Sequence, residues 1–292
     1  MLVYHKTLPY RIFTVFNYIF LITISIGCML PLYHLLMVSF SDTSAANAGL
    51  VTFWPIDFTI EAYEKTFANE NFLTSLGVSI KRTVFGTALA LAVNAVAAYA
   101  LSKDNRVFRG RNVYLWYFVI TMLFNAGLVP GYILIQKLGL LNNLLALILP
   151  GLVAVYNLIL LLNFFRAVPK ELEEATFIDG AGHFRTFISI YLPLSMPALA
   201  TIGLFTMVGH WNAYFDGLIY MKGVENLPLA SFMQTLIVQG STTGFDQAII
   251  ANMSQRTLRA SQIFISALPI LIIYPFLQRF FVKGIVIGAV KE

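Results

Sequence analysis

The sequence predicts an all-α integral membrane protein with six transmembrane helices. Hydrophobic residues make up 58% of the 292 residues and charged residues only 11%, whereas an average soluble domain is about 25% charged. The apolar residues gather in six stretches, each close to or above the roughly 20 residues that cross a bilayer as a helix. Polar segments separate these stretches without a linker or an internal repeat, so a single transmembrane domain is expected over residues 1–292.

Two of the expected spans depart from a simple straight helix. The first is longer than a bilayer requires, so it is tilted, kinked near Pro31 or partly interfacial. The third contains Asn125, Gly127, Pro130 and Gly131, which predict a break within it. The six expected spans cover residues 12–40, 84–101, 113–136, 144–165, 198–220 and 263–282.

Polar residues next to the spans are explained by the membrane itself. Lys81 and Arg82 lie at the outer end of the second span, where their long side chains can extend to the lipid headgroups. Thr59 is expected to cap a short amphipathic helix in the preceding polar segment. The single cysteine, Cys28, excludes a disulfide within the chain.

The distribution of Lys and Arg predicts the orientation. These residues are more numerous in the N-terminal segment, the second-to-third and fourth-to-fifth connections and the tail than in the three opposite connections. The positive-inside rule then places both the N- and C-termini in the cytoplasm. The net charge of +5 does not indicate a nucleic-acid partner, because the basic residues are scattered between apolar runs.

The most distinctive polar segment lies between the fourth and fifth spans, at 169–197: PKELEEATFIDGAGHFRTFISIYLPLSMP. Pro169 and the glutamates after it favour a helix start, because proline has no N–H to leave unpaired and carboxylates favour the positive end of the helix dipole. Gly180 and Gly182 favour the end of that helix. Apolar residues at helical spacing then predict a second helix. The segment is therefore a helix–turn–helix that can present a knob to a soluble partner.

This segment resembles the EAA motif of bacterial ABC-importer permeases. Only Thr176 departs from the motif, at the position of its second alanine. The sequence around it, DGA at 179–181 and LPLSMP at 192–197, resembles the carbohydrate-uptake branch, and the run from NMSQRTLRASQ to the tail resembles permeases for oligosaccharides and polysaccharide fragments. The matching residues are Glu174, Ala175, Gly180, Ile190, Leu192 and Pro193.

The resemblance implies a type I ABC-importer permease fold with a cytoplasmic coupling loop at 166–197 that docks on a separate ATPase. It also implies a homologous second permease subunit in a heterodimer, two ATPase subunits that bind ATP and Mg, an extracytoplasmic solute-binding protein and an oligosaccharide substrate. The chain would lie in the bacterial cytoplasmic (inner) membrane as a multi-pass protein among lipids. The residues expected to couple to the ATPase are Glu171, Glu174, Ala175, Asp179, Gly180 and Ala181.

Several chemistries have no pattern in this sequence. There is no phosphate-binding G-x-x-x-x-G-K-[ST] motif and no His/Cys cluster with metal-ligand spacing, so no cofactor, metal or catalytic residue is expected in the chain itself. No carboxylate lies in the middle of a span, although an ion-coupled transporter would ordinarily need one. A separate ATPase is the simplest source of energy.

Candidate substrate-pathway residues lie in the run HWNAYFDG, toward the outer end of the fifth span. Aromatic faces with amide groups beside them commonly bind sugars. Trp and Tyr also form interfacial belts, and Asn bridges helices, so a structural role stays open; Asn94, Asn125 and Asn157 are expected mainly to bridge helices. The polar segment 239–259 is an open candidate for contact with the solute-binding protein. The expected pathway residues are Trp211, Asn212, Tyr214 and Asp216.

The expected function is therefore the membrane-spanning subunit of an ATP-driven ABC importer for an oligosaccharide. The alternatives are an ABC permease for another solute, such as amino acids or phosphate, and, less favoured, an ion-coupled secondary transporter or a channel. Lys81 and Arg82 near a pathway mouth would attract an acidic, alginate-like substrate. Several carboxylates on the same side oppose this, so a neutral substrate stays open.

Overall fold

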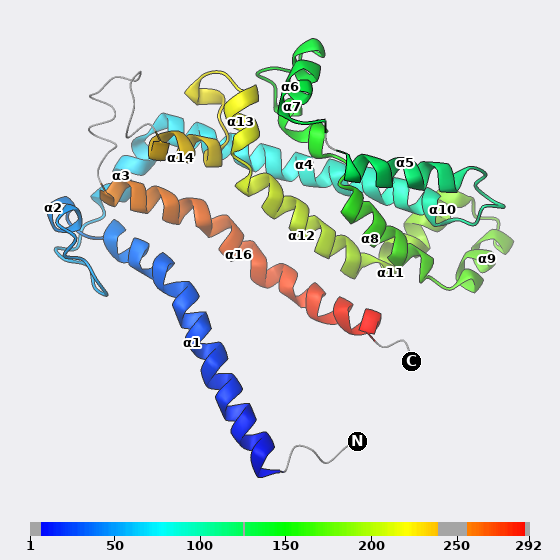
Figure 1. Cartoon of the computed structure of the whole chain (residues 1–292), viewed down its shortest axis with the longest axis horizontal. Helices are drawn as coiled ribbons and strands as arrows, with labels where there is room; N and C mark the ends of the chain where they lie inside the picture. The colour runs from blue at the N-terminus through cyan, green and yellow to red at the C-terminus, as the bar shows by residue number, and fades with distance from the viewer. Residues whose placement is uncertain (1–6, 125, 239–255, 290–292) are drawn as a thin grey trace. The chain divides into compact units, whose positions relative to one another are not determined.

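A computed structural model describes residues 7–124, 126–238 and 256–289, with side chains through Pro275. Over these residues the chain is helical and contains no strand (Figure 1). Most of the polar segment considered for the solute-binding protein, 239–255, lies outside the described residues, as does Asn125.

The helices vary widely in length. The long ones are α1 (Leu8–Ser39), α4 (Glu70–Ser102), α12 (Met196–Asn212) and α16 (Arg256–Ala289). The shorter ones are, in chain order, α2 (Thr43–Asn47), α3 (Glu61–Ala68), α5 (Arg111–Leu123), α6 (Leu128–Lys137), α7 (Leu144–Ile148), η2 (Leu149–Gly151), α8 (Val155–Arg166), α9 (Lys170–Ile178), α10 (His183–Thr186), the π-helix η3 (Phe187–Tyr191), α11 (Leu192–Leu194), α13 (Phe215–Tyr220), η4 (Val224–Asn226) and α14 (Leu229–Val238).

The described residues contain three to six candidate membrane crossings. Three helices are long and apolar enough on their own: α1, α4 and the Arg256–Pro275 part of α16. Three bent pairs qualify if each pair counts as one span: α5 with α6 at 117°, Leu144–Gly151 with α8 at 53°, and His183–Leu194 with α12 at 79°. The expected six spans are the upper end of this range and stay a prediction.

Two helices begin earlier than their apolar stretches predicted. α4 begins at Glu70 rather than near residue 84, and α16 begins at Arg256 rather than near residue 263. The added turns are rich in polar residues that hydropathy assigns to loops. Their side chains are instead buried against other helices, so the helices extend through them. The buried polar residues concerned are Ser75, Ser79, Arg82, Thr257, Ser261 and Gln262.

The fifth expected span, 198–220, is not one helix. α12 ends at Asn212, the backbone of Ala213 is extended, and α13 begins at Phe215. The break is tolerated because side chains donate to its carbonyl groups. Arg82 donates to the carbonyl oxygen of Ala213 at 3.1 Å, and Ser231 donates at 2.6 Å to that of Tyr214, which also accepts from the N–H of Leu218. The segment after it, expected to be a loop, contains α14.

The break expected in the third span is confirmed and is sharp. α5 ends at Leu123, and Gly127 has a φ of 86° immediately before α6 begins. A positive φ of this size is readily available only to glycine. Pro130 lies in the first turn of α6, where its missing N–H removes no hydrogen bond within the helix.

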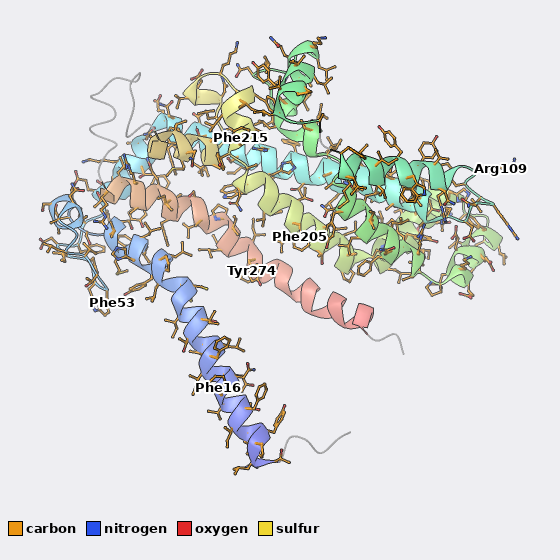
Figure 2. The ribbon with its side chains drawn as sticks, viewed as in Figure 1. Phe16, Phe53, Arg109, Phe205, Phe215 and Tyr274 are labelled. Carbon is orange, nitrogen blue, oxygen red and sulfur yellow. The ribbon has the colours of Figure 1, made fainter. Side chains whose placement is uncertain are left out.

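The chain divides into two compact units, and the first contains residues 1–70 and 236–268. Within it, hydroxyl groups join α3 to the start of α16: the Oγ atom of Ser261 lies 2.8 Å from Oγ1 of Thr66. Most of α1 is uncovered in this unit; Figure 2 shows its side chains projecting outward, and Phe16 is 66% exposed. Such an apolar surface is suited to lipid or to another transmembrane chain.

The second unit contains residues 71–235 and 269–292. Its main core joins α4 to α8, η3 and α12, and small residues on α4 allow the close approach of helices. Figure 1 shows α9 and α10 at the C-terminal end of α4, and α6, α7 and α13 beside its N-terminal half. The buried core residues are Ala95, Ala98, Leu101, Leu158, Leu161, Leu162, Phe165, Phe187, Tyr191, Ala198 and Ile202.

Candidate functional site

The segment after α8 forms the expected helix–turn–helix. α9 follows Pro169 directly and has Glu171 and Glu173 in its first turn. Gly180 has a φ of 78°, in the left-handed region that ends helices. Gly182, expected to help end the same helix, is instead the N-cap of α10, with an ordinary φ of −84°. One left-handed glycine is therefore sufficient for the turn.

The expected coupling residues lie on the open side of this loop. Beside them two apolar side chains project, Ile178 at 86% exposed and Phe184 at 75% exposed; we call this pair the apolar tip. Exposed apolar residues rimmed by polar ones are typical of a protein–protein contact. Ala181 is half-buried, and the exposed coupling residues are Glu171, Glu174, Ala175, Asp179 and Gly180.

On its other side, α9 is joined to the end of α4 by a buried ion pair. The Nζ atom of Lys103 donates to Oε1 of Glu173 at 2.6 Å, and the hydroxyl of Tyr191 donates to Oε2 of Glu173 at 2.6 Å. The same ammonium lies 4.0 Å and 4.1 Å from the ring centres of Tyr99 and Tyr191, within cation–π range. We call Lys103, Glu173, Tyr99 and Tyr191 the Lys103 cluster.

The charges of the Lys103 cluster are matched although they are buried. Lys103 is only 7% exposed. Burial alone would raise the pKa of Glu173, but the hydrogen bonds from Lys103 and Tyr191 outweigh it and hold this pKa below its ordinary value. Glu173 is therefore a carboxylate at neutral pH, and removal of its cation would leave a buried charge uncompensated.

Two weaker contacts complete the loop. Lys170 at the start of α9 pairs with Asp104 at 2.7 Å, but their side chains are 71% and 60% exposed. The hydroxyl of Thr176 lies 2.9 Å from that of Thr186. Thr176, which replaces the second alanine of the motif, therefore joins α9 to α10.

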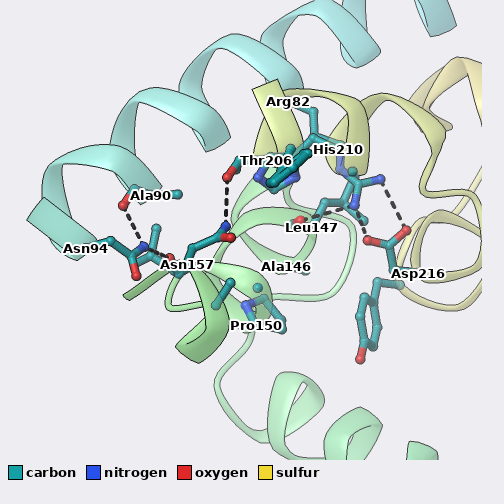
Figure 3. Close-up of a pocket in the computed structure, with 16 residues that line it drawn as sticks. Arg82, Ala90, Asn94, Ala146, Leu147, Pro150, Asn157, Thr206, His210 and Asp216 are labelled. Carbon is teal, nitrogen blue, oxygen red and sulfur yellow. Dashed lines mark hydrogen bonds and ion pairs between the residues drawn. The ribbon is translucent and has the colours of Figure 1, made fainter. Parts of the chain in front are cut away.

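A cavity of about 390 Å³ lies beside α4 (Figure 3). Segments of α4, α7, η2, α8, α12 and α13 contribute to its wall. Its volume lies within the range of small-molecule sites. The polar lining residues are Arg82, Asn94, Asn157, Thr206, His210 and Asp216, beside apolar residues that include Phe205 and Pro150.

Arg82 joins three segments at the wall of this cavity. Its guanidinium forms an ion pair with Asp216 and also donates to the carbonyl oxygens of Ala213 at 3.1 Å and Leu147 at 3.3 Å. Those carbonyls lie at the ends of α12 and α7, where helix carbonyls lose the N–H donors of a following turn. The expectation that Arg82 extends to the headgroups is wrong, because Arg82 is 2% exposed and its guanidinium is bound to Asp216 and to carbonyl groups inside the protein.

Asparagines on the cavity wall bridge helices. Nδ2 of Asn94 donates to the carbonyl oxygen of Leu152 at 2.9 Å, at the bend before α8, and Nδ2 of Asn157 donates to Oγ1 of Thr206 at 3.3 Å. Oδ1 of Asn94 is buried and has no hydrogen-bond partner among the described residues. Nδ2 of Asn94 therefore has a structural role, whereas its Oδ1 atom is an acceptor without a partner among the described residues.

The four expected pathway residues do not share one surface. Asp216 lines the cavity. Trp211 lines a separate apolar pocket of about 130 Å³, together with Ile80 and Pro269 among others. Asn212 and Tyr214 are exposed. Neighbouring positions at a helix end point in different directions, so adjacency in the sequence did not make these residues one site.

Lys103, Glu173, Arg82 and His210 were not among the expected site residues. The two ion pairs join residues that are 70 and 134 positions apart, so no local pattern reveals them. The basic residues at the span ends were attributed to orientation and to headgroup contact, which explain such residues without any partner.

The fold, the bent spans and the exposed coupling loop are features of a transport permease. A family model described as "Binding-protein-dependent transport system inner membrane component" matches residues 7–287. The chain belongs to this family, and the resemblance to ABC-importer permeases that the EAA motif predicted is confirmed.

Individual relatives agree with this assignment over nearly the whole chain. The polygalacturonan/rhamnogalacturonan transport system permease protein YtcP of Bacillus subtilis (strain 168) is 34% identical, over 96% of this chain and 99% of YtcP. Protein LplC of the same strain is 38% identical, over 98% of this chain and 97% of LplC. A solved structure of a bacterial ABC transporter involved in import of the acidic polysaccharide alginate contains a chain with a TM-score of 0.86 and 30% identity, covering 94% of this chain and 99% of that one.

Proposed function

We propose that this chain is the membrane-spanning subunit of an ATP-driven importer that moves an oligosaccharide across the bacterial cytoplasmic membrane. It works with a homologous second permease subunit in a heterodimer, with two ATPase subunits that bind ATP and Mg, and with an extracytoplasmic solute-binding protein. Both termini and the coupling loop then face the cytoplasm. The chain supplies part of the pathway and the contact for the ATPase, and it has no catalytic residue of its own.

The observation that carries this proposal is the form of the coupling loop. Its open side presents the apolar tip and the carboxylates of Glu171 and Glu174, while its other side is fixed by the Lys103 cluster. A loop of this kind suits a partner that pushes on the membrane subunit from one side. An ion-coupled transporter or a channel would have no use for it.

The cavity beside α4 is proposed as part of the solute pathway. Oδ1 of Asn94 and the groups of Asn157 and Thr206 offer hydrogen bonds of the kind that sugar hydroxyls make. The aromatic ring of Phe205 lies in the same wall and can pack against the apolar face of a sugar. The relatives named for galacturonan and alginate transport favour a saccharide over an amino acid or a phosphate.

Reconstitution of the complete complex tests the proposal. The two permeases, the ATPase and the solute-binding protein are placed in lipid vesicles, and ATP hydrolysis is measured with a panel of neutral and uronate oligosaccharides. We expect hydrolysis to rise with the correct sugar, and Glu174→Lys to abolish that rise while the chain stays in the membrane. Gln136→Lys, which introduces a lysine at an exposed position of α6 outside the loop, is the matched control. Normal stimulation in the Glu174→Lys complex would contradict the coupling assignment.

An acidic oligosaccharide is the second candidate substrate, favoured by the similarity to transporters of polygalacturonan/rhamnogalacturonan and of alginate. Arg82 does not support an acidic substrate, because its charge is matched by the carboxylate of Asp216. Lys81 is the remaining exposed cation of that pair. If it attracts an anionic sugar, Lys81→Gln should slow uptake and reduce its sensitivity to salt. Equal rates for wild type and variant over a salt series would favour a neutral oligosaccharide.

A further inference from the structure

α4 connects the two regions described above without interruption. It is a single helix of 33 residues, and it runs past the cavity to the Lys103 cluster. Arg82 and Asn94 contribute to the wall of the cavity, and Lys103 follows the last residue of α4 directly. Lys103 and Arg82 are separated by roughly 30 Å along the helix axis, at 1.5 Å per residue.

The Lys103 cluster is the buried contact between α4 and the coupling helix α9. Both carboxylate oxygens of Glu173 are used, one by Lys103 and one by Tyr191. The side chains of Lys103 and Glu173 are only 8% and 16% exposed. The rings of Tyr99 and Tyr191 confine the ammonium in space. A displacement of α9 away from α4 would therefore separate two buried charges, which is strongly unfavourable.

A second lysine–carboxylate pair connects the same two segments and provides an internal comparison. Lys170 and Asp104 are as close as Lys103 and Glu173, at 2.7 Å against 2.6 Å, but both of their side chains are largely exposed. Water and salt replace an exposed ion pair at little cost. The distance between nitrogen and oxygen therefore does not distinguish the two ion pairs, whereas the burial of their side chains does.

We infer that Lys103 is a positioning residue for energy coupling: with Glu173 it binds the coupling helix to α4, so that displacement of α9 by a partner moves the helix that carries the cavity wall. This inference rests on the proposed function and assigns to it a particular contact. The Arg82–Asp216 pair in the N-terminal half of α4 joins the same helix to α12 and α13, so the movement would reach the cavity through both buried contacts.

The test measures the accessibility of the cavity rather than sugar uptake, so the substrate does not need to be known. Ala154 lines the cavity and is exposed, so Ala154→Cys in a Cys28→Ser background gives one thiol there. The probe is a membrane-impermeant maleimide, applied to the complete complex without nucleotide and after trapping with ATP and vanadate. We expect the labelling rate to change at least fivefold between these states in the complex with Lys103, and less than twofold with Lys103→Met.

Three further variants separate a positioning role from general damage. Lys170→Met removes the exposed pair on the same helix and should retain the fivefold change. Lys103→Arg keeps the cation and should restore most of it, whereas Glu173→Gln keeps hydrogen-bonding atoms without the charge and should not. ATP hydrolysis and the amount of ATPase bound are measured for each variant, since a coupling defect leaves both in place while the cavity stops responding.

The outcomes distinguish the inference from the proposed function. If the starting complex binds no ATPase, or its cavity does not respond to nucleotide, the proposed function fails. If that complex responds and Lys103→Met or Glu173→Gln responds equally, the positioning role of Lys103 is overturned. If Lys103→Met does not assemble, the contrast between Lys103→Arg and Glu173→Gln decides, and equal responses from these two would overturn the inference.

Discussion

Along α4, two buried cations each pair with a carboxylate from a distant segment, Arg82 in the N-terminal half of the helix and Lys103 just after its C-terminal end, but they do so differently. Arg82 pairs with Asp216 and also donates to two backbone carbonyls, at Ala213 and Leu147. The ammonium of Lys103 pairs with Glu173 and lies over the rings of Tyr99 and Tyr191. A guanidinium with its several donors can close two helix breaks at once, whereas an ammonium acts as a compact point charge.

The difference shows that similar ion pairs can serve unlike purposes within one helix. Arg82 is bonded to the backbone of neighbouring segments, so its loss should damage the fold. The ammonium of Lys103 is held by a carboxylate and two aromatic rings, beside a loop that is open on its other side, so its loss should chiefly change how that loop is held. Four comparisons of variants follow from this difference.

The largest loss of stability is expected from substitution of Arg82. Arg82→Met would leave the carboxylate of Asp216 and two carbonyl oxygens without their donor, so the free energy of unfolding should fall by roughly 3–5 kcal/mol. Thermal unfolding in detergent, followed by tryptophan fluorescence, measures this. Lys81→Met, at the exposed neighbouring position, should stay within about 0.5 kcal/mol. Equal stability of the two variants would show that Arg82 is not structural.

A smaller effect is expected from the hydroxyl group of Tyr191. Tyr191→Phe keeps the ring beside Lys103 but removes the hydrogen bond to the buried carboxylate of Glu173, at a cost of about 1.5–3 kcal/mol. Tyr99→Phe removes a hydrogen bond to the carbonyl oxygen of His183 at 3.1 Å and a longer contact with Nδ1 of the same residue at 3.5 Å, neither of which involves a carboxylate, so about 0.5–1.5 kcal/mol is expected. Limited proteolysis within residues 166–197 should therefore accelerate more in the Tyr191 variant. The reverse order would mean that the Glu173 carboxylate does not depend on Tyr191.

The turn after α9 should show backbone strain without crowding. A Cβ atom at Gly180 would meet nothing within 4 Å, but its φ of 78° is costly for a β-branched residue. Gly180→Val should therefore destabilise the loop by about 1–2 kcal/mol, and Gly180→Asn by clearly less, because asparagine visits the left-handed region more readily. Proteolysis rates of the loop compare the two. A valine variant as resistant as the asparagine variant would exclude strain as the reason for the glycine.

The smallest effect is expected from the exposed pair. Lys170→Met should leave the unfolding temperature unchanged at physiological salt, because both side chains of the Lys170–Asp104 pair are largely exposed. Scanning calorimetry of this variant against Lys103→Met gives the direct contrast. A loss of stability as large as that of Lys103→Met would remove the distinction between buried and exposed pairs at this end of α4.

The sequence predicted the membrane class and the coupling loop because both depend on local patterns. Span length follows from runs of apolar residues, and the loop follows from proline, glutamates and glycine at fixed spacing. The end of α12 at Asn212 could not be predicted in this way, since the break there is stabilised by Ser231 and by Arg82 from other segments. Hydropathy likewise placed the start of α4 too late, because it counts Ser75 and Arg82 as solvent-facing when they are buried.

The candidate site was predictable on the loop and poorly predictable in the cavity. The residues expected to couple to the ATPase lie together because they follow one another around a single turn. The cavity is lined by residues from six segments, and of the four pathway residues expected in the fifth span only Asp216 is among its lining residues, beside His210 from the same run. A pathway assembled from helix breaks depends on which carbonyls those breaks leave free, and that is decided by tertiary contacts.

The pairing of Arg82 with Asp216 has a consequence for the synthesis of the protein. The two residues are 134 positions apart, so at 5–20 residues per second the aspartate follows the arginine by roughly 7–27 s. During that time the second helix enters the membrane with an unmatched cation, which opposes insertion by up to about 2.5–3.5 kcal/mol. The apolar residues of α4 after Arg82 must hold the helix in the bilayer until its partner arrives, so shortening that apolar run should reduce membrane integration before it affects the mature fold.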